Sequence, residues 1–113
     1  MGAFNVIFPI LPGKEDAARA WIAELAGPRK EGFDAMQRRS EIERETLTLQ
    51  ATPNGSFMLV WFDGNVAKAF ATVATDEDEF TVWHRAQLRD VTGLDLSEPE
   101  EGPPPELLLD WRA

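Results

Sequence analysis

Residues 43–62, Glu43-Arg-Glu-Thr-Leu-Thr-Leu-Gln-Ala-Thr-Pro-Asn-Gly-Ser-Phe-Met-Leu-Val-Trp-Phe62, decide the fold of this chain. The first half alternates leucine with polar residues, which is typical of a strand that buries one face. Residues 57–62 are a continuous apolar run of strand-forming residues. Thr52-Pro-Asn-Gly55 lies between the two runs and is a turn sequence, so this stretch predicts a β-hairpin.

The length of the turn decides which side chains share a face of the hairpin, because a slip of one residue inverts a strand. We expect a three-residue loop with Gly55 as the bulge residue, since Pro53 suits that turn, and Leu47 then lies opposite Trp61. A two-residue Asn54-Gly55 loop would exchange these partners. The expected first face carries Leu47, Leu49, Phe57, Leu59 and Trp61, and the second carries Thr46, Thr48, Gln50, Met58, Val60 and Phe62.

The segments on either side of the hairpin complete an alternating order of strands and helices. An apolar strand is expected over residues 4–10, and helical periodicity runs from residue 13 to about 40 with a break at Gly27-Pro28. Two further helical segments follow, over residues 65–75 and from 76 to about 91, where Thr92-Gly93 stops the second. With a short last strand at Leu107–Trp111, the order predicts the ferredoxin-like α+β fold, βαββαβ.

The domain organisation follows from the same pattern. We expect a ferredoxin-like domain over residues 1–96 and an extended Pro/Glu-rich linker over 97–106. Residues 107–113 then form a short strand that docks on the sheet or on a partner subunit. Helices cover only one face of such an antiparallel sheet, and Met58, Val60 and Phe62 are assigned to the other. We therefore expect a homodimer that forms through the open sheet face.

Composition excludes several classes of protein. The chain has 113 residues and a net charge of −9, which repels nucleic acid and anionic membranes. It has no apolar run long enough to span a bilayer and no basic secretory signal. The absence of cysteine excludes disulfides and thiolate metal sites, and it favours a cytoplasmic location. A metal site is not expected, because one histidine with scattered acids supplies no ligand spacing.

Five stretches of the chain together resemble one uncharacterised protein family. They are FPILPGKE at 8–15, LQATPNG at 49–55, Phe80-x-x-Trp83-His84, TGLDLS at 92–97 and the most specific one, PPPELLLDW at 103–111. That family is placed in the dimeric α/β-barrel superfamily, with distant fold-level kinship to antibiotic-biosynthesis-type monooxygenases. The resemblance implies that two sheets meet face to face in a barrel-like dimer. It supplies no reaction, because the superfamily includes monooxygenases, mutarotases and non-catalytic ligand binders.

His84 is the only histidine and the first residue to suspect in a proton transfer at neutral pH. On a helix over residues 80–91, His84 and Gln87 fall in the middle of the apolar stripe, so both must be hydrogen-bonded. One interpretation is a neutral core histidine bonded to a backbone carbonyl or to Gln87. The other is a candidate general base or ligand-binding group that lines a pocket between helices and sheet.

Four further residues are candidates for substrate binding: Asn5, Trp61, Trp83 and Gln87. Superfamily members that degrade haem use a helix histidine as axial ligand, with an asparagine and a tryptophan on strands nearby. The resemblance implies that His84 is the axial ligand and that Asn5 and Trp61 are the two strand residues. The 23-residue separation of Trp61 and His84 departs from that family's pattern. Glu43 and Glu45 share one face of their strand, and we interpret them as a solvated strand entrance.

These observations leave three functional hypotheses open. The first is a cofactor-free enzyme that acts on a small aromatic or carbonyl compound, with His84 as general base. The alternative is a non-catalytic dimeric module that binds a small apolar ligand or has a structural role. The second alternative is a haem-binding or haem-degrading protein. No cofactor is expected for the first two.

Overall fold

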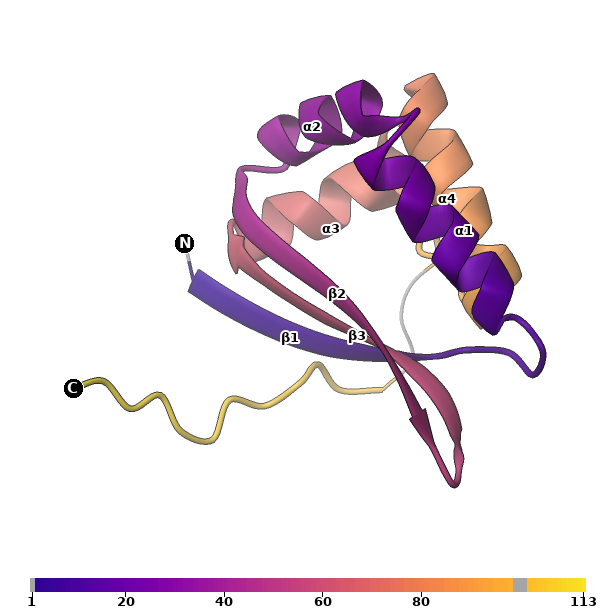
Figure 1. The fold of residues 1–113 in the computed structure, drawn as a ribbon. Coiled ribbons are helices and arrows are strands. Elements are labelled where there is room, and N and C mark those ends of the chain that lie inside the picture. Colours follow the sequence, from indigo (N-terminus) through magenta and orange to yellow (C-terminus); the bar gives the residue numbers. More distant parts are fainter. Residues whose placement is uncertain (1, 99–101) are drawn as a thin grey trace.

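Four helices cover one face of a three-stranded antiparallel sheet, and the other face of the sheet is left open (Figure 1). The structure is a computed structural model that describes residues 2–98 and 102–113, so residues 99–101 of the expected linker lie outside the described residues. In chain order the elements are β1 (Gly2–Pro9), α1 (Glu15–Ala26), α2 (Lys30–Arg39), β2 (Ile42–Thr52), β3 (Gly55–Gly64), α3 (Val66–Thr75) and α4 (Glu79–Thr92). The predicted α+β class is confirmed.

Local signals account for the ends of the helices. The side chain of Asn65 accepts a hydrogen bond from the backbone N–H of Lys68 at 3.1 Å, which caps the N-terminus of α3. Gly93 ends α4 in the left-handed conformation with φ +77°, where its backbone N–H donates to the carbonyl of Arg89. Pro28 separates α1 from α2, as the sequence predicted. None of the helices described is both long and apolar enough to cross a membrane.

The predicted hairpin is present, but its predicted register is wrong by one residue. Thr52 lies opposite Gly55, so the loop has two residues, Pro53 and Asn54, and Leu47 pairs with Val60 instead of Trp61. The hydroxyl of Thr52 donates to the Gly55 carbonyl at 2.8 Å and accepts from the Asn54 backbone N–H at 3.1 Å. These two hydrogen bonds close the two-residue turn in place of the expected three-residue loop.

The corrected register places the apolar side chains of the hairpin under the helices. Met58, Val60 and Phe62 are buried on the covered face and not on the open face, to which the expected register assigns them. They share that face with a partly buried set on the neighbouring strands, Phe4, Val6, Leu47 and Leu49. The hydrophobic effect therefore selects this register, because the expected one would have left half of these side chains on the side away from the helices.

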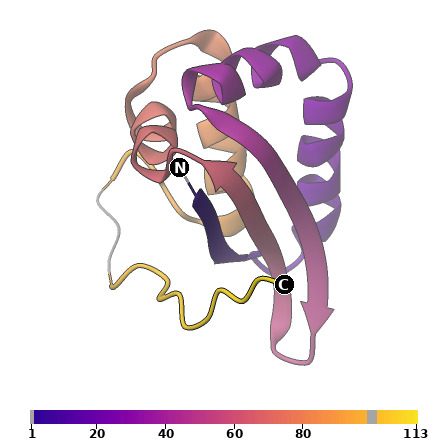
Figure 2. The ribbon, with the colours of Figure 1, turned by 90° about the vertical axis from the view of Figure 1, so that its left-hand side faces the viewer.

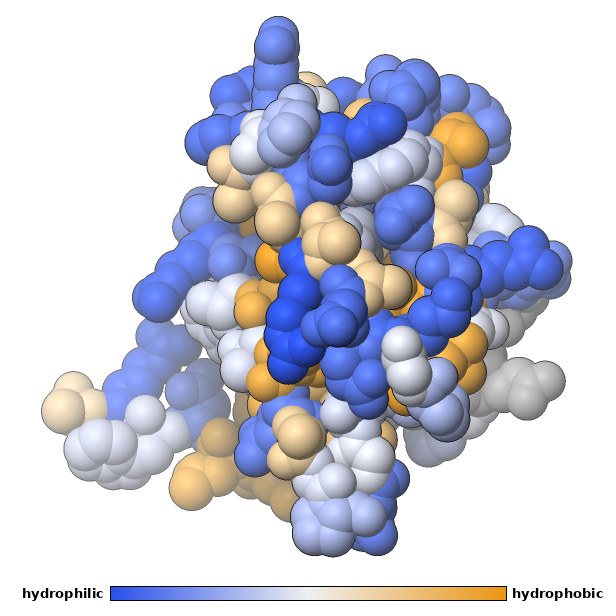
Figure 3. Space-filling view, turned by 45° about the vertical axis from the view of Figure 1, so that its right-hand side comes forward, coloured by the Kyte–Doolittle hydropathy of each residue, from blue (hydrophilic) through white to orange (hydrophobic). Residues whose placement is uncertain are grey.

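The open face carries the other half of each strand. β3 contributes Phe57, Leu59 and Trp61, which are partly buried, and β2 contributes Thr46, Thr48 and Gln50 opposite them. β1 adds Ile7, which is 55% exposed. By contrast, the side of the molecule that carries α1 and α4 is mainly hydrophilic with small hydrophobic spots (Figure 3). The open sheet face thus carries a row of large apolar side chains on β3 beside polar residues on β2.

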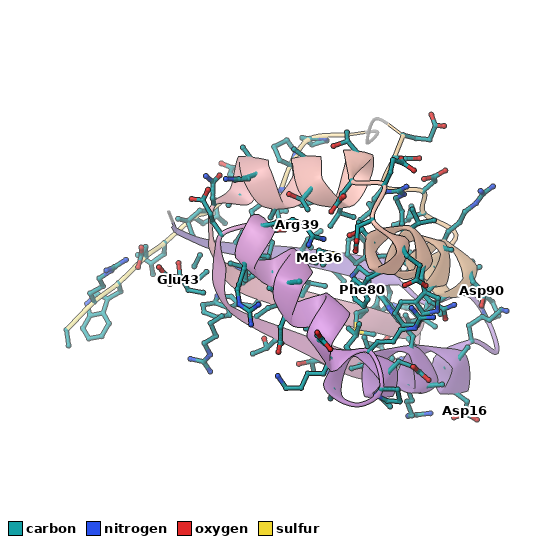
Figure 4. All side chains as sticks on the ribbon, turned by 90° about the horizontal axis from the view of Figure 1, so that it is seen from above. Asp16, Met36, Arg39, Glu43, Phe80 and Asp90 are labelled. Atoms are coloured by element: carbon teal, nitrogen blue, oxygen red, sulfur yellow. The ribbon has the colours of Figure 1, made fainter. Side chains whose placement is uncertain are left out.

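A close approach between α2 and α4 sets the position of the helical layer. A Cβ atom on Gly32 would lie only 2.7–2.9 Å from the ring and Cβ of Phe80, so the absence of a side chain lets this ring pack against the α2 backbone. Phe80 forms a small second cluster with Leu25 and Met36, and Figure 4 labels Phe80 and Met36 between the helices. The larger core lies between the helices and the covered sheet face.

The C-terminal segment 102–113 runs as an irregular chain on the side of the sheet away from the helices (Figure 2). Its apolar side chains are exposed, from 72% for Leu107 to 84% for Leu108. The hydrogen bond to Asp110 raises the pKa of Arg112, and the charge of Asp63 on β3 adds to this effect. Residues 107–113 form no strand in the single chain, so the docking of this segment stays a prediction.

Candidate functional site

A cavity of about 80 Å³ lies between the helices and the covered face of the sheet. Each strand and each helix contributes at least one residue to its wall, and most of the wall is apolar. Four polar side chains interrupt it: His84 on α4, Gln37 on α2, Ser40 at the end of α2 and Glu45 on β2. The cavity is therefore mainly apolar, with polar side chains at two separate places in its wall. His84 is at one place, and Gln37, Ser40 and Glu45 are at the other, around the α2–β2 connection.

His84 is held by aromatic neighbours from three helices. The indole N–H of Trp21 on α1 donates to Nδ1 of His84 at 3.1 Å, in a buried hydrogen bond across 63 positions of sequence. Phe80 stacks on the imidazole with ring centroids 5.6 Å apart, and Phe33 lies 6.1 Å away. Burial in this apolar surrounding lowers the pKa of His84 from 6.5 to about 4, so the ring is neutral at physiological pH.

The hydrogen bond from Trp21 also assigns the tautomer of His84. Because Nδ1 accepts a proton donor, the proton of the neutral ring sits on Nε2. Among the residues that the structure describes, Nε2–H of His84 has no hydrogen-bonded acceptor. His84 is therefore equipped to donate a hydrogen bond to a molecule in the cavity. The expected interpretation of a neutral core histidine fits, but its partner is an indole and not Gln87 or a carbonyl.

A second polar group is formed by Glu45, Gln37 and Ser40. Nε2 of Gln37 donates to Oε1 of Glu45 at 2.5 Å. The other end of that amide, Oε1 of Gln37, is buried without a partner, and so is the hydroxyl of Ser40, within the described part of the chain. Ser40 is completely buried. Burial raises the pKa of Glu45, and the hydrogen bond from Gln37 partly offsets this rise.

The position of Glu45 corrects the expectation that Glu43 and Glu45 form a solvated entrance. The pairing of β2 with β3 is irregular between Ile42 and Arg44, which leaves Glu43 as an extra, exposed residue. Figure 4 shows Glu43 at the outer margin of the molecule. Glu45 instead lies opposite Phe62 on the covered face. The two glutamates therefore have different surroundings, and only Glu45 contacts the cavity.

Two of the predicted binding residues lie on the wrong side of the sheet to join His84. Asn5 and Trp61 are paired neighbours on β1 and β3, and both belong to the open face. The guanidinium of Arg44 packs over the Trp61 ring at 5.4 Å. The set of Asn5, Trp61 and His84, on which the haem hypothesis depended, is thus divided by the sheet within one chain.

Trp83 and Gln87 share α4 with His84 but do not line the cavity. The Trp83 ring lies 5.6 Å from Phe80 and stacks under the guanidinium of Arg29, 4.1 Å away, near the surface. Gln87 is partly buried, and no hydrogen bond joins it to His84. Of the five predicted site residues, the structure therefore places only His84 at the cavity.

The residues that the sequence analysis missed are Glu45, Gln37, Ser40 and Trp21. A signal for Glu45 was present, since Glu45, Leu47 and Leu49 alternate and must share a face of β2. The helical spacing of Trp21 indicates a packing residue, and its indole N–H also needs a buried hydrogen-bond partner, which is His84. Ser40 and Gln37 gave no such signal, because a polar pair at the end of a helix is usually solvated.

No family model matches the chain, and the searches of curated proteins and of solved structures found no match either. The resemblance to the dimeric α/β-barrel superfamily therefore stays a prediction. Among the described residues, no group of three or more histidine, aspartate or glutamate side chains is arranged to hold a metal ion.

Proposed function

We propose that this protein is a small-molecule-binding module that holds a small, mainly apolar ligand in the cavity beside His84. The observation that carries the proposal is the cavity itself, whose wall is apolar apart from a few convergent polar groups. Its volume of about 80 Å³ is roughly half that of an engineered cavity that binds benzene, about 150 Å³. A ligand of a few non-hydrogen atoms suits this space.

Binding is favoured over catalysis by the state of His84. Its basic nitrogen Nδ1 is engaged by Trp21, and its pKa is lowered to about 4, so it is a weak proton acceptor at neutral pH. As a donor through Nε2–H it can orient a ligand that carries an acceptor. This hydrogen bond from His84 to a ligand involves no proton transfer, so it suits a binding site.

A binding experiment with an inert apolar probe tests this proposal. Xenon should shift the methyl NMR signals of the cavity-lining Val6, Val73 and Leu88 and leave those of Leu59 on the open face unchanged. The matched control is Ala69→Leu, which fills the cavity from α3 and should abolish the shifts. Equal shifts in the wild type and in Ala69→Leu, or no shifts at all, contradict the proposal.

The second candidate is a cofactor-free enzyme, which one observation supports. Glu45 is a carboxyl group at the cavity, and burial raises its pKa above the ordinary value, which strengthens it as a general base. In such an enzyme Glu45 would accept the proton, and His84 would donate a hydrogen bond to a carbonyl oxygen of the substrate. Proton exchange at the α-carbon of acetone in deuterated water, lost in Glu45→Gln, is the expected signature. Exchange that survives in Glu45→Gln rules this candidate out.

We also propose that the fold is ferredoxin-like and that two copies associate through the open sheet face. The strand order β1-β3-β2 supports the first part, because a last strand paired with the free edge of β1 would complete the ferredoxin-like sheet. The row of Phe57, Leu59 and Trp61 supports the second, since an apolar sheet face calls for a covering layer. The apolar segment 107–111 lies on the same side of the sheet and would add to the contact.

Sedimentation tests the dimer. We expect the wild type to sediment as a dimer at micromolar concentration and Trp61→Glu to sediment as a folded monomer, because a charge at this position cannot be buried against a second sheet. Val82→Glu is the control, since Val82 is an apolar residue exposed on α4, away from the open sheet face. A wild-type protein that is monomeric at this concentration would refute the association.

A further inference from the structure

We propose that Glu45, Gln37 and Ser40 form the subsite that selects the ligand, and that it takes the protonated amino group of a small primary amine with an apolar body. The inference deepens the binding function proposed above and rests on it. It assigns the two ends of the cavity different tasks. The apolar walls hold the body of the ligand, and the end at the α2–β2 connection holds its polar head.

Two buried polar atoms at the α2–β2 end of the cavity have no hydrogen-bond partner within the part of the chain that the structure describes. Gln37 uses its amide N–H on Glu45 and leaves its carbonyl oxygen buried without a donor. The fully buried Ser40 hydroxyl has no partner among the described residues. Buried polar groups are nearly always hydrogen-bonded, so these atoms point to a partner outside the chain. Both residues line the cavity, which is where that partner has room.

The three polar groups at this end of the cavity are all hydrogen-bond acceptors. The Gln37 oxygen and the Glu45 carboxylate accept only, and the Ser40 oxygen can accept as well. An ammonium group offers three N–H donors and no acceptor, so three oxygen atoms can satisfy it. Charge-assisted hydrogen bonds to a carboxylate are the strongest of this kind.

The electrostatic surroundings of this end of the cavity favour a positively charged group. In the described part of the chain, no lysine or arginine lines the cavity. Ser40 is the C-terminal cap of α2, and the C-terminal end of a helix carries partial negative charge. Arg39, next to Ser40, is engaged by Asp76 at 2.8 Å and by Asp78 at 3.6 Å. Arg44, next to Glu45, lies over the Trp61 ring on the open face. This surrounding repels a carboxylate or phosphate head and attracts a cationic one.

The position of Glu45 gives the subsite access from outside. Phe33, Glu45 and Leu47 line both the cavity and a second, shallower pocket that Ile22, Leu25 and Ala26 complete on the α1 side. These three side chains form the wall between the two spaces, beside the edge strand β2. A ligand that enters with its apolar body first leaves its amino group at this wall, next to Glu45.

Three probes with the same branched four-carbon skeleton and different heads test the proposal: isobutylamine, isobutanol and isobutyrate. Their apolar parts, of three or four carbon atoms, suit a cavity of about 80 Å³. In methyl NMR titrations at neutral pH, we expect isobutylamine to bind at least about tenfold more tightly than isobutanol, and isobutyrate not to bind. Glu45→Gln should weaken isobutylamine by about tenfold or more and change isobutanol little. The exposed Glu43→Gln is the matched control and should change neither.

The pH dependence provides an independent readout. Isobutylamine should bind more tightly as pH rises through the raised pKa of Glu45, because the carboxylate then pairs with the ammonium. Isobutanol should show no such dependence. Among the residues that the structure describes, Glu45 and His84 are the only titratable side chains that line the cavity or the shallower pocket beside it. The pKa of His84, about 4, keeps it out of this pH range.

The outcomes separate this inference from the function on which it rests. If isobutyrate binds as well as isobutylamine, or if Glu45→Gln keeps the preference for the amine, the inference is wrong. If xenon enters the cavity but none of the isobutyl probes binds, ordered water satisfies Gln37 and Ser40, and the inference is wrong although an apolar binding site remains. If xenon does not enter either, both proposals fail.

Discussion

The two faces of the sheet are built from the same three strands but differ in what covers them. On the covered face β3 places Met58, Val60 and Phe62, which are between 2% and 8% exposed. On the open face the alternate residues Phe57, Leu59 and Trp61 are apolar as well, yet only partly buried. A strand that is apolar on both faces differs from the alternating pattern of a sheet with one solvated side. Only the covered face is explained by the folding of one chain.

This difference teaches which face contributes to stability and which to association. Burial against the helices stabilises the monomer, because apolar area is removed from water within the chain. The same kind of residue on the open face gains comparable burial only when another surface covers it. Changes of similar size on adjacent residues of β3 should therefore act on different equilibria, and the following predictions test this division.

The largest effect is expected from Phe62→Ala on the covered face. Removal of a ring that is 4% exposed should lower the free energy of unfolding by about 3–5 kcal/mol. Trp61→Ala, one residue away on the open face, should cost the monomer only about 1 kcal/mol, because the ring is partly exposed. Urea denaturation of dilute protein measures both values. Similar losses for the two variants would erase the distinction between the faces.

The next largest effect is the pH dependence that His84 imposes on the covered side. The pKa of His84 is about 4 in the folded state and 6.5 when unfolded, so the unfolded state binds more protons between these values. The stability that His84 contributes is present above pH 6.5 and is lost as pH falls toward 4. The loss amounts to about 3 kcal/mol.

His84→Gln provides the comparison, because the variant keeps a polar side chain that can accept from Trp21 but does not titrate. The difference in unfolding free energy between wild type and variant should depend on pH only between about 4 and 6.5. NMR titration of the imidazole in the folded protein checks the same quantity directly. A titration midpoint near 6.5 would show that His84 is hydrated in the folded protein and would contradict this prediction.

A smaller effect of opposite sign is expected from Ser40→Ala. The hydroxyl of Ser40 is buried and unpartnered in the described chain, so its removal should raise the free energy of unfolding by about 1 kcal/mol. The same substitution should weaken the binding of isobutylamine. Thermal unfolding and NMR titration of one variant thus distinguish a ligand-binding hydroxyl from a structural one. A less stable Ser40→Ala protein would indicate a structural role.

The smallest effect on the monomer should come from removal of residues 107–113. These residues are exposed and form no element in the single chain, so the unfolding free energy of dilute protein should change by less than about 0.5 kcal/mol. If the segment covers the open face of a second copy, its removal should shift the sedimentation profile toward the monomer. A large loss of monomer stability would instead mean that the segment docks on its own sheet.

The parts of the fold that could be predicted from the sequence are those with local causes. Pro28 and Gly93 mark helix ends through backbone restrictions that no distant contact overrides. The hairpin was predictable from Thr52–Gly55, but its register was not, because loops of two and three residues are both compatible with Pro53 and Gly55. The choice depended on packing against helices that are distant in the sequence.

The candidate site was harder to predict because its residues come together only through tertiary contacts. The inward direction of His84 followed from helical periodicity, but its partner Trp21 lies on another helix. The one-residue error in register groups Trp61 with Leu47 and Leu49, whereas Trp61 lies on the opposite face. No expected pairing placed Asn5, whose face depends on the register of β1 with β3. For Glu45 two signals in the sequence conflict. Its alternation with Leu47 and Leu49 indicates a position on the buried face, whereas the general rule that carboxylates are exposed indicates the solvent side.

The contact between Gly32 and Phe80 has a consequence for the evolution of the site. Neither residue lines the cavity, yet their close approach sets how far α2 lies from α4, and Phe80 in turn supports the imidazole of His84. A methyl group at position 32 would act as a wedge between the two helices and alter the dimensions of the chamber beneath them. The range of molecules that this protein accepts can therefore drift through a position that never meets the ligand, while the chemistry of the walls stays the same.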